Sequence, residues 1–279
     1  MADINNKYVL EGSHGEVARL QKQHLWFQSS LNGQIVFAPL ELQQAGLRVL
    51  DIGCADGTLL RDLQQSVSHD AELIGLDVSE SFLPKSAQGN IRYVVGDLNE
   101  PFSEELNDYF DLTHLRYTLV GASKLSVEKA VANLTSTLKP GGWLQVQEPD
   151  LSLKTWEHQS SALADFVTIL GAVLDKVGIG HGFSVSLDDA FRKAGLENVS
   201  VKEVKYPIGA KTANPEAARS SIETFLTTVE TAVGSVKALN VDIPPAVMEN
   251  LAKRFETEMS ENGGEYRGVI VIGQKKAAS

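Results

Sequence analysis

The feature that most constrains this chain is a short apolar run that leads into an acidic residue and a glycine turn. Residues 47–57 read Leu-Arg-Val-Leu-Asp-Ile-Gly-Cys-Ala-Asp-Gly, and leucines follow at positions 59, 60 and 63. This order predicts a strand, a tight loop and a helix. In parallel α/β sheets such a loop binds nucleotides, and a carboxylate at the end of the next strand holds the ribose. The next predicted strand, residues 73–76, is followed by Asp77.

The spacing of the glycines separates two classes of ligand. Gly53, Ala55 and Gly57 give the pattern Gly-x-Ala-x-Gly, whereas a dinucleotide pyrophosphate is held by Gly-x-Gly-x-x-Gly at a helix N-terminus. Asp51 and Asp56 would repel a phosphate, but they suit a cationic ligand with an amino acid portion, such as S-adenosylmethionine. The alternative is a tight turn that binds no ligand.

Four further segments follow the first one in order along the chain. They are Leu-Ile-Gly-Leu-Asp-Val at 73–78, Ile-Arg-Tyr-Val-Val-Gly-Asp-Leu at 91–98, Phe-Asp-Leu-Thr-His-Leu-Arg at 110–116 and Leu-Lys-Pro-Gly-Gly-Trp-Leu at 138–144. Together the five segments resemble the successive motifs of the Rossmann-like S-adenosylmethionine-dependent methyltransferases, with Ala55 where the middle glycine is usual. The resemblance implies an α/β fold with a doubly wound, mostly parallel sheet of seven strands, in which the last strand is inserted antiparallel.

The N-terminal segment carries a second resemblance. Tyr8-Val9-Leu10, residues 21–26 and Arg116 are similar to the fungal natural-product methyltransferases and to the related fungal regulators of secondary metabolism. In such enzymes N-terminal helices form a lid over the cofactor, so the amphipathic pattern at 16–31 is expected to cover the site. Two helical patterns, introduced by Asn214-Pro215 and Pro244-Pro245, interrupt the last two strands. We expect residues 1–35 and 210–262 to pack over the strand ends.

The resemblance implies a cofactor site at the ends of the strands. Asp77 is expected to accept both ribose hydroxyls and Asp97 the adenine amine, while the backbone N–H of Leu98 binds a ring nitrogen. The remaining expected cofactor residues are Asp51, Gly53, Ala55, Val78 and Arg116, the last binding a carboxylate of the cofactor or of the substrate. The alternatives are a helix cap for Asp77, a turn residue for Asp97 and a surface ion pair for Arg116.

The expected chemistry needs few catalytic groups. Methyl transfer from a sulfonium is an in-line displacement, so alignment of donor and acceptor in a dry pocket supplies much of the rate. A hydroxyl acceptor would benefit from a histidine base, for which His24 and His114 are the candidates and His181 is a third. Thiolate or amine acceptors need no base. Trp26, Tyr117 and Glu148 are expected to contact the substrate; the alternative for Trp26 is a core aromatic.

Composition limits the partners. A net charge of −11 and a pI near 5.0 disfavour nucleic acid, which requires a basic face. No signal peptide, transmembrane run or zinc-ligand spacing is visible, so we expect a cytoplasmic protein that acts on a small molecule, without a membrane or a metal. A homodimer is left open. The only cysteine, Cys54, is expected to be a small buried side chain.

We expect one domain over residues 1–279. It would comprise a helical lid (1–35), a Rossmann-like core (36–208), a helical insertion (209–265) and a last strand with a tail (266–279). The leading hypothesis is a methyltransferase of specialised metabolism that acts on oxygen, nitrogen or sulfur of a small molecule. The alternatives are a regulatory protein that binds S-adenosylmethionine and acts through protein partners, and an enzyme recruited to a non-methylating reaction. The long insertion favours an enclosed pocket and hence the first hypothesis.

Overall fold

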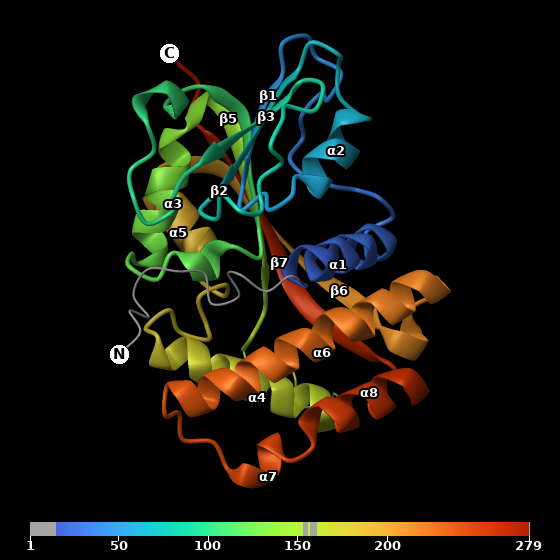
Figure 1. The fold of residues 1–279 in the computed structure, drawn as a ribbon. Coiled ribbons are helices and arrows are strands. Elements are labelled where there is room, and N and C mark those ends of the chain that lie inside the picture. The colour runs from blue at the N-terminus through green and yellow to red at the C-terminus, as the bar shows by residue number, and fades with distance from the viewer. Residues whose placement is uncertain (1–14, 153–155, 157–160, 279) are drawn as a thin grey trace.

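A seven-stranded mixed sheet forms the frame of the computed structural model, which describes residues 15–152, 156 and 161–278 (Figure 1). The strand order is β3-β2-β1-β4-β5-β7-β6. The strands are β1 (Arg48–Ile52), β2 (Glu72–Asp77), β3 (Ile91–Val95), β4 (Phe110–Arg116), β5 (Leu138–Pro149), β6 (Leu196–Ile208) and β7 (Gly264–Lys275). Strands β1 to β5 pair in parallel, and β7 runs antiparallel between β5 and β6. The predicted doubly wound α/β sheet and its antiparallel last strand are confirmed.

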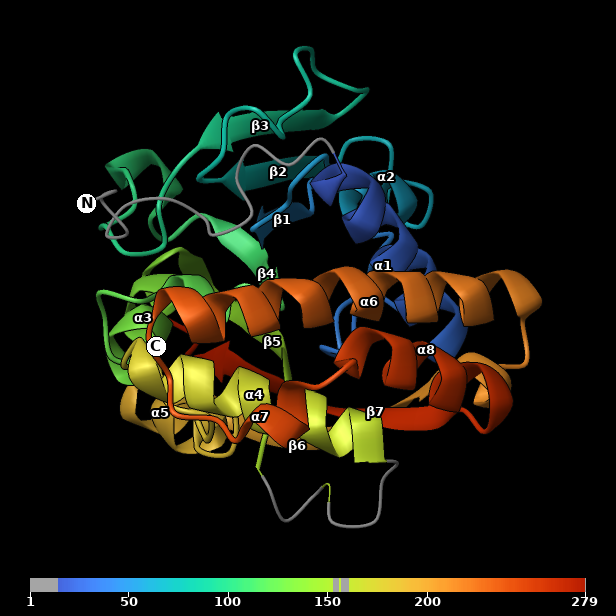
Figure 2. The same cartoon turned by 60° about the horizontal axis from the view of Figure 1, so that its bottom comes forward.

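Helices pack against the sheet, and several of them form an additional layer beside its last two strands. The helices are α1 (Glu16–Ser30), α2 (Thr58–Gln64), α3 (Val127–Ser136), α4 (Ser161–Lys176), α5 (Leu187–Lys193), α6 (Pro215–Ala238), α7 (Pro245–Met248) and α8 (Leu251–Glu261). The late helices α4, α6, α7 and α8 gather beside β6 and β7, in the lower part of Figure 1. Figure 2 shows α1 between α2 and the long α6, both of which it contacts. No helix in the described ranges is long and apolar enough to span a bilayer.

Capping residues in the sequence set the starts of α3 and α6. The side chain of Ser126 accepts the backbone N–H of Lys129 at the start of α3, and the side chain of Asn214 caps α6, with Pro215 at its first position. The single helix predicted after Pro244 is wrong, because the chain breaks into α7 and α8. The break lies at Asn250, whose φ is 49°, a left-handed conformation that asparagine tolerates better than most residues.

Two clusters of buried apolar side chains lie on opposite faces of the sheet. Successive side chains of a strand point to opposite faces, so Leu50 belongs to the larger cluster and its neighbour Val49 to the smaller one. The larger cluster continues from the central strands into α4, α6 and α8, for example through Phe166 and Phe255. The late helices and the sheet therefore share a hydrophobic core.

Candidate active site

The turn after β1 is defined by backbone conformation and close packing. Gly53 and Gly57 have φ angles of 73° and 75°, which residues with a Cβ rarely adopt. A Cβ on Gly53 would clash with the side chain of Thr118, and one on Gly57 would clash with the ring of Tyr93. Ala55 also has a positive φ, 48°. Only glycine therefore fits at positions 53 and 57, whereas Ala55 holds a strained conformation.

Asp77 ties this turn to the end of β2. Its Oδ2 accepts the backbone N–H of Ala55 and its Oδ1 that of Ser79, both at 2.9 Å. Burial raises the pKa of Asp77, and the two N–H donors oppose that rise. An ionised carboxylate has about four acceptor positions, so the side chain can still accept two ribose hydroxyls. Asp77 thus has a structural role in addition to the one that the sequence predicts.

The predicted adenine side of the site lies after β2 and β3. Val78 is 48% exposed at the rim, next to the buried Asp77, and Leu98 is buried. Asp97 uses Oδ1 to accept the backbone N–H and the side-chain amide of Asn99, at 2.9 and 2.8 Å. An exposed valine beside a carboxylate offers an apolar surface with a polar edge, which suits a nucleoside.

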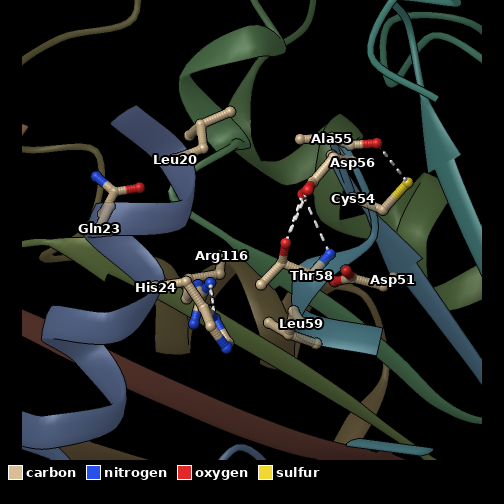
Figure 3. Close-up of a pocket in the computed structure, with 11 residues that line it drawn as sticks. Leu20, Gln23, His24, Asp51, Cys54, Ala55, Asp56, Thr58, Leu59 and Arg116 are labelled. Carbon is tan, nitrogen blue, oxygen red and sulfur yellow. Dashed lines mark hydrogen bonds between the residues drawn. The ribbon is translucent and has the colours of Figure 1, made fainter. Parts of the chain in front are cut away.

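A cavity of about 50 Å³ lies between the glycine turn and α1 (Figure 3). One wall comes from the turn, α2 and the ends of β1 and β4, and the other from α1. Its lining residues are Leu20, Gln23, His24, Asp51, Gly53, Cys54, Ala55, Asp56, Thr58, Leu59 and Arg116. Four of the predicted cofactor residues, Asp51, Gly53, Ala55 and Arg116, are therefore brought together with the candidate base His24.

Polar side chains of α1 bridge this cavity. The amide of Gln21 donates to Oδ2 of Asp56 at 2.8 Å. His24 lies between Arg116 and Asp62: its Nδ1 is 2.9 Å from Nη2 of Arg116, and its Nε2 is 2.8 Å from Oδ2 of Asp62. Arginine can only donate hydrogen bonds, so Nδ1 of His24 is the acceptor. The hydrogen of the neutral ring therefore sits on Nε2, which donates a hydrogen bond to Asp62. Burial and the charge of Arg116 lower the pKa of His24. His24 would therefore have to release Arg116 before its Nδ1 could act as a base.

His114 lies deeper, in the middle of β4. Its Nδ1 is 2.7 Å from Oδ1 of Asp51, the residue directly opposite in β1, and both side chains are buried. Within the described part of the chain, Nε2 of His114 has no hydrogen-bond partner. Asp51 lines the cavity and His114 does not, so His114 orients Asp51 from the side that faces away from the cavity. The third histidine, His181, pairs with Asp175 at the end of α4.

The expected substrate residues Trp26, Tyr117 and Glu148 do not line this cavity. Trp26 is 1% exposed, and its Nε1–H donates to the carbonyl of Pro207 at 2.7 Å, as a core aromatic would. Tyr117 packs on Phe27 with 4.9 Å between the ring centroids. Glu148 is fully buried at the end of β5, and burial raises its pKa to about 8.

Several residues of the site carry no motif in the sequence. Thr118, Asp62, Tyr206 and Tyr266 are examples, and none of them was predicted. Tyr206 and Tyr266 face each other across the β6–β7 pairing, a register that the sequence does not reveal. Cys54 is buried as expected, and burial and the neighbouring Asp51 raise its pKa, which disfavours a thiolate nucleophile. The described residues contain no group of three or more side chains that could hold a metal.

Several known proteins that are similar to this chain are named as methyltransferases. A family model described as a methyltransferase domain matches residues 24–201. Methyltransferase psoC of Aspergillus fumigatus is 30% identical over 95% of this chain and 96% of its own. N-methyltransferase tcpN of Claviceps purpurea is 27% identical over 96% of this chain and 99% of its own.

Among solved structures, this chain is similar to phosphoethanolamine N-methyltransferase 2 of Haemonchus contortus, in complex with phosphomonomethylethanolamine and S-adenosylhomocysteine. The TM-score is 0.55 at 14% identity, over 96% of this chain and 59% of that chain. At this level of identity the likeness concerns the fold alone.

Proposed function

This chain belongs to the methyltransferase family, and on that premise we propose that it transfers a methyl group from S-adenosylmethionine to a small molecule of specialised metabolism. The name of the relative tcpN, an N-methyltransferase, supports nitrogen as the methyl acceptor, ahead of oxygen or sulfur. Relatives named as methyltransferases do not favour a purely regulatory protein or a non-methylating enzyme. The net charge of −11 supports a substrate other than nucleic acid. A cytoplasmic location and a homodimer stay predictions.

The observation that carries this proposal is the convergence of Asp51, Gly53 and Arg116 on one cavity, with Asp77 tied to the turn beside it. These residues fit the cofactor: carboxylates suit the ammonium of its methionine portion and Arg116 suits the carboxylate. Asp77 retains acceptor positions for the ribose, and Val78 offers an apolar face to the adenine. When bound, S-adenosylmethionine supplies an electrophilic methyl group on a sulfonium.

In this proposal His114 positions Asp51, and His24 helps to hold α1 over the cavity. His114 holds Asp51 through the 2.7 Å contact, so Asp51 can present its other oxygen to the cofactor. His24 and Gln21 connect α1 to Asp62 and Asp56 across the cavity, which makes α1 the cover that excludes water from the reacting groups. The helices of residues 209–265 back this cover, because α6 packs along α1. His24 acts as a base only when Arg116 has turned away to another partner.

Calorimetry with S-adenosylhomocysteine tests the cofactor site. Asp77→Ala removes the ribose acceptor, and we expect it to weaken binding by about 2–3 kcal/mol. It also leaves two backbone N–H groups without an acceptor, so the free energy of unfolding should fall by about 1–3 kcal/mol for each buried donor. The sequence alone predicts that the fold is retained in this variant, and the two bonds of Asp77 add a cost in stability to that prediction.

Asp111→Asn is the matched control, because Asp111 is also a buried acid that accepts a backbone N–H, from Arg48, but it lies at the opposite end of the strands. This variant should bind S-adenosylhomocysteine like the wild type. If the wild type does not bind S-adenosylhomocysteine, the proposed cofactor use is wrong. If it binds but transfers no methyl group to a broad panel of small molecules, a regulatory role gains support.

A further inference from the structure

Two buried polar atoms lack partners at the ends of β4 and β5. Oε1 of Glu148 accepts the backbone N–H groups of Thr118 and Leu119, at 2.9 and 2.7 Å. Oε2 of the same carboxyl group has no partner among the described residues, and neither has the hydroxyl of Tyr117. Buried polar groups are normally hydrogen-bonded, and an exception often marks a functional role. A carboxyl group with one fixed and one free oxygen is arranged to receive a ligand.

Thr118 connects this carboxyl group to the cofactor turn. Its backbone N–H donates to Glu148, and its side chain fills the space where a Cβ of Gly53 would lie. Gly53 lines the cavity, and in the proposed function its backbone approaches the methionine portion of the cofactor. Thr118 therefore lies between Gly53 and Glu148, at the ends of β4 and β5. The ends of neighbouring central strands open on the same crevice of a doubly wound sheet.

Three tyrosines lie close enough to Glu148 to be affected by its charge. Tyr117 packs between Phe27 and Tyr266, and Tyr206 pairs with Tyr266 across the strands. Burial raises the pKa of Tyr117, Tyr206 and Tyr266, and the charge of Glu148 raises each of them further. The three hydroxyls thus stay neutral near pH 7, and Glu148 is a carboxyl group that can ionise within this aromatic region.

We propose that Glu148 is the proton acceptor of the methyl transfer, and that the acceptor substrate presents a neutral N–H or O–H group beside an aromatic or apolar surface. This inference rests on the methyltransferase function above. Oε2 takes the proton, and the electron pair of the nitrogen or oxygen forms the bond to the methyl carbon. The pair of the breaking S–CH3 bond returns to sulfur, which leaves a neutral thioether. The protonated Glu148 loses its proton to solvent when the product leaves.

Two observations fit this role. Burial sets the pKa of Glu148 at about 8, close to neutral pH, where a general base transfers protons efficiently. The two N–H donors on Oε1 fix the orientation of the carboxyl group, so that Oε2 needs no reorganisation to receive a proton.

Sinefungin offers a test that needs no knowledge of the substrate. It is an analogue of S-adenosylhomocysteine that carries an amine at the position of the transferred methyl group, so a carboxylate on the acceptor side should bind it preferentially. Glu148→Gln keeps an oxygen for Thr118 and Leu119 but removes the charge. We expect the ratio of the two dissociation constants to shift against sinefungin by about tenfold, equivalent to about 1.4 kcal/mol. Binding of S-adenosylhomocysteine should be nearly unchanged, and Asp111→Asn should keep the wild-type ratio.

The wild type provides a second measurement that does not depend on the folding of a variant. Its preference for sinefungin should rise between about pH 7 and 9, as Glu148 ionises around its pKa of about 8, and then level off. The other titratable groups that face this region are His24, Arg116, Tyr117, Asp150, Tyr206 and Tyr266. Burial lowers the pKa of His24 and raises that of each tyrosine, so these groups stay neutral across that interval, while Arg116 stays charged.

Three results would overturn the inference. The first is an unchanged ratio in Glu148→Gln, and the second is an equal loss of both ligands, which would make Glu148 a support of the Thr118 loop only. The third is a preference for sinefungin that does not vary with pH in the wild type. Failure of the wild type to bind S-adenosylhomocysteine at all is a different outcome, which would remove the proposed function and this inference with it.

Discussion

Ala55 holds a left-handed backbone conformation, with φ of 48°, between two glycines that also have positive φ. A residue with a Cβ loses about 1–2 kcal/mol in this conformation, while glycine adds entropy to the unfolded chain. Ala55→Gly should therefore leave the free energy of unfolding unchanged or raise it by up to about 1 kcal/mol, as measured by urea denaturation. The matched change Ala132→Gly, on the exposed side of α3, should lower it by about 1 kcal/mol. Equal losses in both variants would contradict the strain at Ala55.

Glu148 makes stability depend on pH in a definite direction. Its pKa rises from 4.5 to about 8 on folding, so the folded state binds this proton more tightly than the unfolded state. The resulting stabilisation is complete below about pH 4.5 and is lost as pH rises through about 8. The free energy of unfolding of the wild type should thus fall relative to that of Glu148→Gln over this interval, by up to about 5 kcal/mol. Parallel stability curves from denaturation at a series of pH values would rule out a buried, titrating Glu148.

At the scale of an element, α1 divides into two halves with different partners. Gln21 bonds Asp56 and His24 bonds Arg116, and both partners line the cavity. Trp26 and Phe27 instead belong to the large core cluster. We expect S-adenosylhomocysteine to slow amide hydrogen exchange at residues 19–24 and to leave residues 26–30 unaffected, because only the first half can open without unpacking the core. Uniform protection along α1, or none, would contradict this division. The sequence predicts protection over residues 8–30, of which 8–14 lie outside the described residues.

Elements with local signals could be predicted, and contacts between distant elements could not. The turn of Asp51, Gly53 and Gly57 is one contiguous stretch whose residue types encode its shape, so the cofactor loop follows from the sequence. The bond from Thr118 to Glu148 joins residues 30 apart and depends on the register of β4 on β5. The core position of Trp26 likewise depends on the carbonyl of Pro207, 181 residues away, and no local pattern contains that information.

At the scale of the whole molecule, the sheet and the late helices should unfold together. Trp26 and Trp156 lie in the larger core cluster, and Trp143 lies in the smaller one. In a Trp143→Phe variant the remaining tryptophans report the larger cluster, while far-ultraviolet circular dichroism reports the whole chain. We expect coincident urea transitions by both probes, as in a cooperative single domain. An earlier fluorescence transition would mean that α4, α6 and α8 form a separate unit with β6 and β7.

The position of β7 has a consequence for how the protein is made. The strand is the last of the seven to leave the ribosome, yet it lies between β5 and β6 and provides the partner of Tyr206. Until residues 264–275 emerge, β6 has no neighbouring strand in this sheet, and its open edge invites pairing with other nascent chains. A premature stop codon shortly before β7 would therefore spare every residue of the cofactor turn and still give an aggregating product. The chain should therefore tolerate truncation within residues 264–275 as poorly as it tolerates changes in the turn at residues 51–57.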